Sequence, residues 1–102
     1  RLDRKFETIE DKYISSAERA LAEGVDTVDF RAATWCAKEA VYKYLGREGV
    51  DFRRDMQVVA LDPTGVYIDI EAFGERLHCA IFQLDGALLV ATAKGEVSFV
   101  LR

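Results

Sequence analysis

The sequence predicts an α+β fold, with N-terminal helices and a long central helix packed on an antiparallel β-meander. Residues 29–46 form the longest run with helical periodicity, and they separate small apolar side chains from polar and aromatic ones. After Arg54 the pattern changes to apolar, β-type runs divided by short turn sequences. Helices followed by strands is the order typical of α+β domains.

The N-terminal part of the chain predicts short helices. Thr8 precedes acidic residues, which is typical of an N-cap followed by a first helical turn. Ser15 and Glu18 have the spacing of a capping box, in which each residue caps the backbone of the other. The segment is therefore predicted as one helix to Glu23 or as two short helices with a break near Ser15. Gly24 is expected to close it.

The central helix is predicted from Asp29 to Leu45, with Gly46 as the left-handed residue that ends it. One side is expected to pack on the sheet because it is small and apolar: Ala33, Cys36, Ala37, Ala40, Val41 and Tyr44. The other side carries polar and aromatic groups: Trp35, Lys38, Glu39, Tyr42 and Lys43. By themselves, Glu39 and Lys43 have the spacing of an ordinary surface ion pair, and Lys38 reads as a surface charge.

Five strands are predicted after an irregular loop at residues 47–54. They cover residues 56–61, 66–72, 76–84, 87–93 and 96–101. The sequence Asp62-Pro-Thr-Gly65 favours a type I turn, and Asp85-Gly86 favours a two-residue hairpin. Polar residues alternate with apolar ones in the second strand, so one face of the sheet is expected to be polar there.

The composition predicts a single domain over residues 1–102 and argues against two function classes. The net charge is −4 without a basic run, which disfavours nucleic-acid binding. The apolar runs fall short of the roughly 20 residues needed to cross a membrane. Cys36 and Cys79 lack metal-site spacing, so we expect reduced core thiols in a cytoplasmic protein. So small a domain is expected to gain stability from self-association.

The run Trp35-Cys-Ala-Lys-Glu-Ala-Val-Tyr-Lys43 resembles the signature helix of the 4′-phosphopantetheinyl transferases, closest to the small holo-(acyl carrier protein) synthase type. The shared pattern is an aromatic residue, two small residues, Lys-Glu-Ala, a Lys four positions after the Glu, and a Gly that ends the helix. The likeness continues around Lys5 and Tyr13, and from Gly49 to Val58. It therefore covers most of the chain and implies this family's fold.

The resemblance implies transfer of 4′-phosphopantetheine from coenzyme A to a serine of an acyl carrier protein, as in fatty acid or polyketide biosynthesis. It implies Glu39 as a catalytic residue and the Mg²⁺ ligand, because this ion prefers carboxylate oxygens. Lys43 would be catalytic too, binding phosphate of coenzyme A or taking the serine proton. Lys38 would bind the coenzyme or act as an outer-shell partner. The implied assembly is a cytoplasmic homo-oligomer, most simply a trimer.

The sequence departs from the family pattern at four points. No Gly-x-Asp strand with the family's first metal ligand is found, so we expect the chain to lack that strand, which lies upstream of Arg1 or is absent. Ala80-Ile-Phe-Gln83 stands where Ser-x-Ser-His is usual, and His78 is interpreted as a surface strand residue. Val66-Tyr67 replaces Lys-Pro, and Asp85-Gly86 replaces a longer loop. The alternatives are a catalytically silent relative that binds a carrier protein or serves assembly, and a generic interaction domain.

Overall fold

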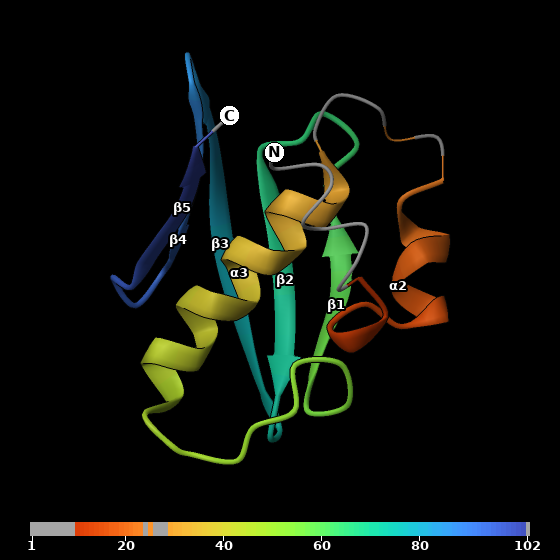
Figure 1. The fold of residues 1–102 in the computed structure, drawn as a ribbon, viewed down its shortest axis with the longest axis vertical. Helices are drawn as coiled ribbons and strands as arrows, with labels where there is room; N and C mark the ends of the chain where they lie inside the picture. The colour runs from red at the N-terminus through yellow and green to blue at the C-terminus, as the bar shows by residue number, and fades with distance from the viewer. Residues whose placement is uncertain (1–9, 24, 26–28, 102) are drawn as a thin grey trace.

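The computed structural model describes residues 10–23, 25 and 29–101 and has two layers (Figure 1). One layer is a five-stranded antiparallel sheet in the order β1-β2-β3-β4-β5, which is also the order along the chain. The other layer is helical, and α3 lies across one face of the sheet (Figure 1). The predicted α+β class and the meander are therefore confirmed.

Two short helices precede α3. A 3₁₀ helix, η1, covers Glu10–Lys12, and α2 covers Ser16–Leu21. Ser15 caps α2 through the predicted capping box: its side chain accepts from the backbone N–H of Glu18, whose carboxylate accepts from the backbone N–H of Ser15. This break at Ser15 confirms the two-helix alternative. The expected cap at Thr8 and the stop at Gly24 lie outside the described residues.

The central helix, α3, covers Phe30–Leu45 and has the predicted ends. Asp29 caps it by accepting from two backbone N–H groups of the first turn, and Gly46 follows it with φ 60. The predicted apolar side faces the sheet, and five of its members are fully buried: Ala33, Cys36, Ala37, Ala40 and Val41. The sixth, Tyr44, is half-buried because its hydroxyl reaches the surface and donates to Glu75 over 2.6 Å.

The strands begin and end within one residue of the predicted positions. They are β1 Met56–Leu61, β2 Tyr67–Ala72, β3 Glu75–Leu84, β4 Ala87–Thr92 and β5 Val97–Leu101. Their registers place Ile70 opposite Leu77 and Ile81 opposite Val90, so buried side chains line up on the face beneath α3. Val66 was expected to begin the second strand, but it precedes β2 and is exposed.

The face of the sheet away from α3 has a polar part and an apolar part. On β2 and β3, Asp69 accepts from Arg76 and from His78, and these neighbours leave it only 8% exposed. His78 itself is an exposed strand residue, as interpreted from the sequence. The apolar part lies on β3, β4 and β5, and we call it the apolar sheet face. Its most exposed members are Phe82, Leu84, Phe99 and Leu101.

Both cysteines lie in the core between the two layers. Cys36 on α3 and Cys79 on β3 are fully buried free thiols, as predicted. Burial raises the pKa of each thiol to about 12. Within the described residues, no helix is long and apolar enough to cross a membrane.

Candidate functional site

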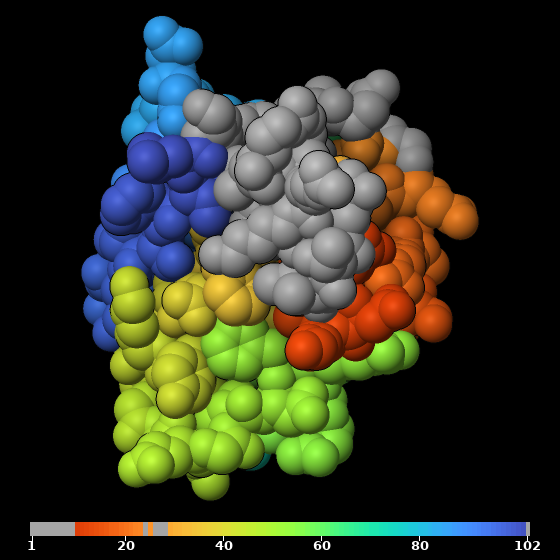
Figure 2. Space-filling view, in the orientation of Figure 1, coloured from red at the N-terminus to blue at the C-terminus, as the bar shows by residue number. Residues whose placement is uncertain are grey.

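The polar side of α3 divides into two regions with different surroundings. Lys38 points toward η1, α2 and the loop at residues 47–55, where it binds backbone oxygens of Tyr13 and Phe52. Lys43 reaches β5, where it binds the backbone oxygen of Val97. Figure 2 shows the second half of α3 at the surface, between β5 and the loop that follows the helix. The two lysines therefore contact different parts of the fold.

Lys38 is fully buried, so its interpretation as a surface charge is wrong. Its Nζ donates to the backbone oxygens of Tyr13 over 2.6 Å and Phe52 over 2.7 Å. It also pairs with the carboxylate of Glu18 at 2.8 Å. An ammonium has three protons, and these three partners use them all. Burial lowers the pKa of Lys38, and the hydrogen bond and charge of Glu18 oppose that effect.

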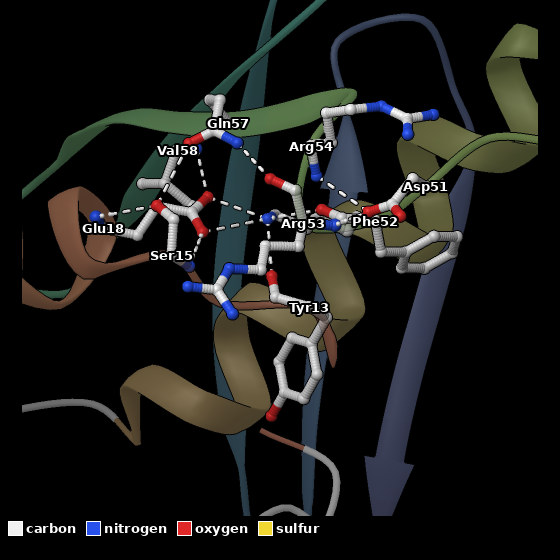
Figure 3. A network of polar contacts seen from close by, with 10 residues as sticks. Tyr13, Ser15, Glu18, Asp51, Phe52, Arg53, Arg54, Gln57 and Val58 are labelled. Carbon is white, nitrogen blue, oxygen red and sulfur yellow. Dashed lines mark hydrogen bonds and ion pairs between the residues drawn. The ribbon is translucent and has the colours of Figure 1, made fainter. Parts of the chain in front are cut away.

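Glu18 is the buried partner, although its spacing from Ser15 predicted only a capping role. Its carboxylate accepts from the backbone N–H of Ser15 at 2.8 Å and from that of Val58 at 2.6 Å, in addition to Lys38. Figure 3 shows Ser15, Glu18 and Val58 close together, where the start of α2 meets β1. A buried ion pair needs such extra hydrogen bonds to offset the loss of water. The pair Glu18–Lys38 thus joins α2, α3 and β1.

Glu39 and Lys43 lie on the open region of α3 and do not form the expected ion pair. No salt bridge joins them, and Glu39 makes no hydrogen bond or ion pair to any described residue. Glu39 is half-buried, so its carboxylate remains accessible at the helix surface. Lys43 is exposed, and its Nζ donates to the backbone oxygen of Val97 over 2.8 Å. Both side chains retain unused capacity to bind a ligand.

A pocket adjoins Lys43 at the C-terminal end of α3. It has a volume of about 210 Å³, and we call it the basic pocket; it is lined by Tyr42, Lys43, Gly46, Arg47 and Glu48. The Arg47 guanidinium stacks over the ring of Phe73 at 4.1 Å, which ties this end of α3 to the turn between β2 and β3. Two cations in one pocket favour a phosphorylated ligand. Arg47 was not predicted as a site residue, because it lies beyond the signature run.

On the open region of α3, Glu39 offers a carboxylate to a metal ion. Among residues 10–23, 25 and 29–101, no group of three His, Cys, Asp or Glu side chains is arranged to hold a metal. Mg²⁺ keeps several waters and is often bound by one or two carboxylates together with substrate phosphates. Glu39 therefore fits an ion that arrives with a phosphorylated substrate, and it does not form a closed metal cage.

A helix-on-sheet domain with an open carboxylate one helical turn from an exposed lysine is suited to bind a phosphorylated substrate with a metal ion. Residues 1–93 match the family model of the 4′-phosphopantetheinyl transferase superfamily, so the chain belongs to this superfamily. Its members transfer phosphopantetheine from coenzyme A to carrier proteins, usually with a metal. No curated protein and no solved structure matches the chain.

Proposed function

We propose that this protein transfers 4′-phosphopantetheine from coenzyme A to a serine of an acyl carrier protein, in the cytoplasm and with Mg²⁺. The observation that carries the proposal is the pair Glu39 and Lys43, one helical turn apart and not bonded to each other. In a member of this superfamily, an uncompensated carboxylate and an exposed ammonium on one helix face are the groups that a pyrophosphate substrate requires.

Glu39 would hold Mg²⁺ together with waters and phosphate oxygens of the substrate, and the bound ion would neutralise charge on the pyrophosphate. Lys43 would bind a phosphate oxygen as a point charge. We favour this role over proton transfer, because Lys43 is exposed and lines the basic pocket with Arg47. The serine oxygen would attack the β-phosphorus, and adenosine 3′,5′-bisphosphate would leave.

Lys38 is proposed as a positioning residue rather than a direct contact of the coenzyme. Its three protons already bind Glu18 and the backbone oxygens of Tyr13 and Phe52. Lys38 precedes Glu39 in the sequence, so anchoring its side chain fixes the rotation of α3 about its own axis. That rotation directs Glu39 toward the surface.

We also propose that the protein assembles as a homotrimer through the apolar sheet face. Phe82 pairs with Leu89, which pairs with Phe99 on β5, so three strands present one continuous apolar surface. Phe99 is 60% exposed, and no described element covers it. Exposed apolar patches of this kind mark association surfaces. Sedimentation equilibrium should give a trimer mass for the wild type and a monomer mass for Phe99→Asp; a monomeric wild type at micromolar concentration rejects the assembly.

The test of the activity is conversion of apo carrier protein to its holo form by the full-length protein, with coenzyme A and Mg²⁺, followed by mass spectrometry. Glu39→Gln keeps the shape and removes the charge, so it should abolish conversion. Glu71→Gln is the matched control, because Glu71 is exposed on the opposite face of the sheet. A Glu39→Gln variant as active as the wild type would refute the site.

The second candidate function is a catalytically silent relative that binds a carrier protein or serves assembly. It is favoured by the lack, among the described residues, of three His, Cys, Asp or Glu side chains arranged to hold a metal around Glu39 or elsewhere. Such a protein would bind carrier proteins, yet it would convert none of a panel under the same assay. Wild-type inactivity over that panel, with carrier binding retained, selects this candidate.

A further inference from the structure

The turn between β2 and β3 holds an aromatic residue in a disfavoured backbone conformation. Phe73 and Gly74 form a two-residue hairpin turn, since the pairing of the two strands closes on either side of them. Both have positive φ, 52 for Phe73 and 81 for Gly74. Such a turn favours Asn-Gly, because a bulky side chain is sterically disfavoured at positive φ. Among the described residues, Phe73 is the one non-glycine residue with positive φ.

The core gains no packing from Phe73 that would offset this strain. The side chain is 50% exposed and is not among the described residues that form the hydrophobic core or pack against it. It also lies outside the apolar sheet face, where Phe82 and Phe99 are exposed together. Asparagine or glycine would form the same turn with less strain. A strained and exposed aromatic residue therefore indicates a contact with another molecule.

Two contacts fix this turn against the C-terminal end of α3. The Arg47 guanidinium stacks over the Phe73 ring at 4.1 Å. The hydroxyl of Tyr44 donates to the carboxylate of Glu75, the residue that follows the turn, over 2.6 Å. Figure 1 shows the turn at the same end of the molecule as the loop that follows α3. Because Arg47 also lines the basic pocket with Lys43, the exposed ring adjoins that pocket.

We propose that Phe73 is an anchor for the carrier protein, an inference that rests on the proposed function. The acceptor serine belongs to a folded protein, so one face of that protein must rest on this chain for the serine to reach Glu39 and Lys43. Phe73 offers this face an exposed ring, and Arg47 offers a cation beside the ring. Aromatic residues and arginine are enriched among the residues that dominate protein interfaces. The matching surface of the carrier has an apolar side chain next to a carboxylate.

The variant Phe73→Asn separates docking from folding, because asparagine tolerates positive φ. The full-length protein is assayed with coenzyme A, Mg²⁺ and increasing apo carrier protein. The KM for the carrier should rise about tenfold, as expected when an interface anchor is lost. The kcat and the KM for coenzyme A should stay nearly unchanged. The midpoint of thermal unfolding should equal or exceed that of the wild type, because the strain is relieved.

Two further variants serve as controls. Phe73→Tyr keeps the ring, so it should retain the carrier KM of the wild type. Val66→Asn is the matched control, because Val66 is an exposed apolar residue like Phe73 but precedes β2 at the other end of that strand. It should also leave the carrier KM unchanged.

The outcomes separate this inference from the proposed function. An active wild type with the same carrier KM as Phe73→Asn overturns the anchor and leaves the activity standing. A lower unfolding midpoint with equal losses for both substrates overturns it too, because the role of Phe73 would then be structural. If no carrier protein is converted, calorimetry measures carrier binding. Binding that Phe73→Asn weakens supports the anchor, whereas unchanged binding, or none by the wild type, overturns it.

Discussion

The two regions on the polar side of α3 each have a lysine of this helix near a glutamate, which is Glu18 of α2 in one region and Glu39 of α3 in the other, and the two pairs differ in their surroundings. Lys38 is fully buried with Glu18, and every proton of its ammonium has an acceptor. Lys43 is exposed beside Glu39, which has no bonded partner among the described residues. The adjacent residues Lys38 and Glu39 thus have different roles. The closed pair fixes the helix, and the open pair remains available for a ligand.

The largest expected effect comes from breaking the closed pair on one side. Lys38→Met keeps most of the volume but leaves the Glu18 carboxylate buried without its cation, and the oxygens of Tyr13 and Phe52 without a donor. Removing one partner of a buried pair costs about 3–5 kcal/mol. Chemical denaturation followed by Trp35 fluorescence should show this loss. Lys43→Met, the same exchange on the open face, is the matched control and should change stability by less than about 0.5 kcal/mol.

A double variant sharpens this comparison. In Glu18→Gln with Lys38→Met the buried charges are gone, while the Gln oxygen still accepts from Ser15 or Val58. The double variant should therefore be more stable than the sum of the two single losses predicts, by about 1–3 kcal/mol. Additive losses in that double-mutant cycle would mean that the two side chains do not stabilise each other, contrary to their 2.8 Å contact.

The helix and strands were predictable because their signals are local. The alternation of small and polar residues predicted α3, and Asp29 and Gly46 predicted its ends. Turn residues predicted each strand to within one position. The burial of Lys38 was not predictable, because helical periodicity gives the direction of a side chain and not what packs over it. Only the fold brings Glu18 over that side of α3.

The site was predictable in part for the same reason. The Lys-Glu-x-x-x-Lys spacing identified Glu39 and Lys43 as candidates, and their assignment to metal and phosphate stays a prediction. Glu39 and Lys43 do not form an ion pair with each other, because the Lys43 side chain adopts a rotamer that reaches the backbone oxygen of Val97 on β5. Sequence spacing does not specify such a rotamer. The basic pocket was not predicted, although its lining residues lie within residues 42–48, because its shape depends on the path that the chain takes after Gly46.

Thr34 on α3 has a buried polar group that lowers the stability of the fold. The hydroxyl of Thr34 on α3 is buried and has no hydrogen-bond partner among the described residues. A buried hydroxyl in this state costs about 1–3 kcal/mol, and valine has nearly the same shape and helix propensity. Thr34→Val should therefore raise the free energy of unfolding by about 1 kcal/mol. Thr34→Ser keeps the hydroxyl and should give no gain; a destabilised Thr34→Val would contradict the unpaired state.

A pH titration tests the loop that covers Trp35. The Asp51 carboxylate accepts from the backbone N–H groups of Arg54 and Arg53, and these bonds hold its pKa below the ordinary 3.8. A lowered pKa means stabilisation that is present above pH 3.8 and is lost as the pH falls through the lower folded value. Trp35 emission should therefore change below pH 3.8, and less steeply in Asp51→Asn.

The control for this titration is Asp62→Asn. The pKa of Asp62 is also lowered, mainly by the hydroxyl of Thr64, but Asp62 lies in the turn between β1 and β2, at the opposite end of the sheet from the loop (Figure 1). Asp62→Asn should leave the acid response of Trp35 as in the wild type. Equal responses in wild type and Asp51→Asn would show that Asp51 does not hold the loop.

The smallest expected effect on stability belongs to Glu39. Glu39→Gln removes no hydrogen bond or ion pair to a described residue, so the free energy of unfolding should change by less than about 0.5 kcal/mol. The same denaturation experiment measures it, beside Glu18→Gln, which weakens the buried pair and should cost several times more. If the free energy of unfolding of Glu39→Gln fell by more than about 1.5 kcal/mol, Glu39 would have a structural role like that of the Glu18–Lys38 pair. The loss of activity in this variant would then reflect a loss of folded protein. An unchanged stability makes that loss of activity a direct measure of the charge that Glu39 offers to the metal and substrate.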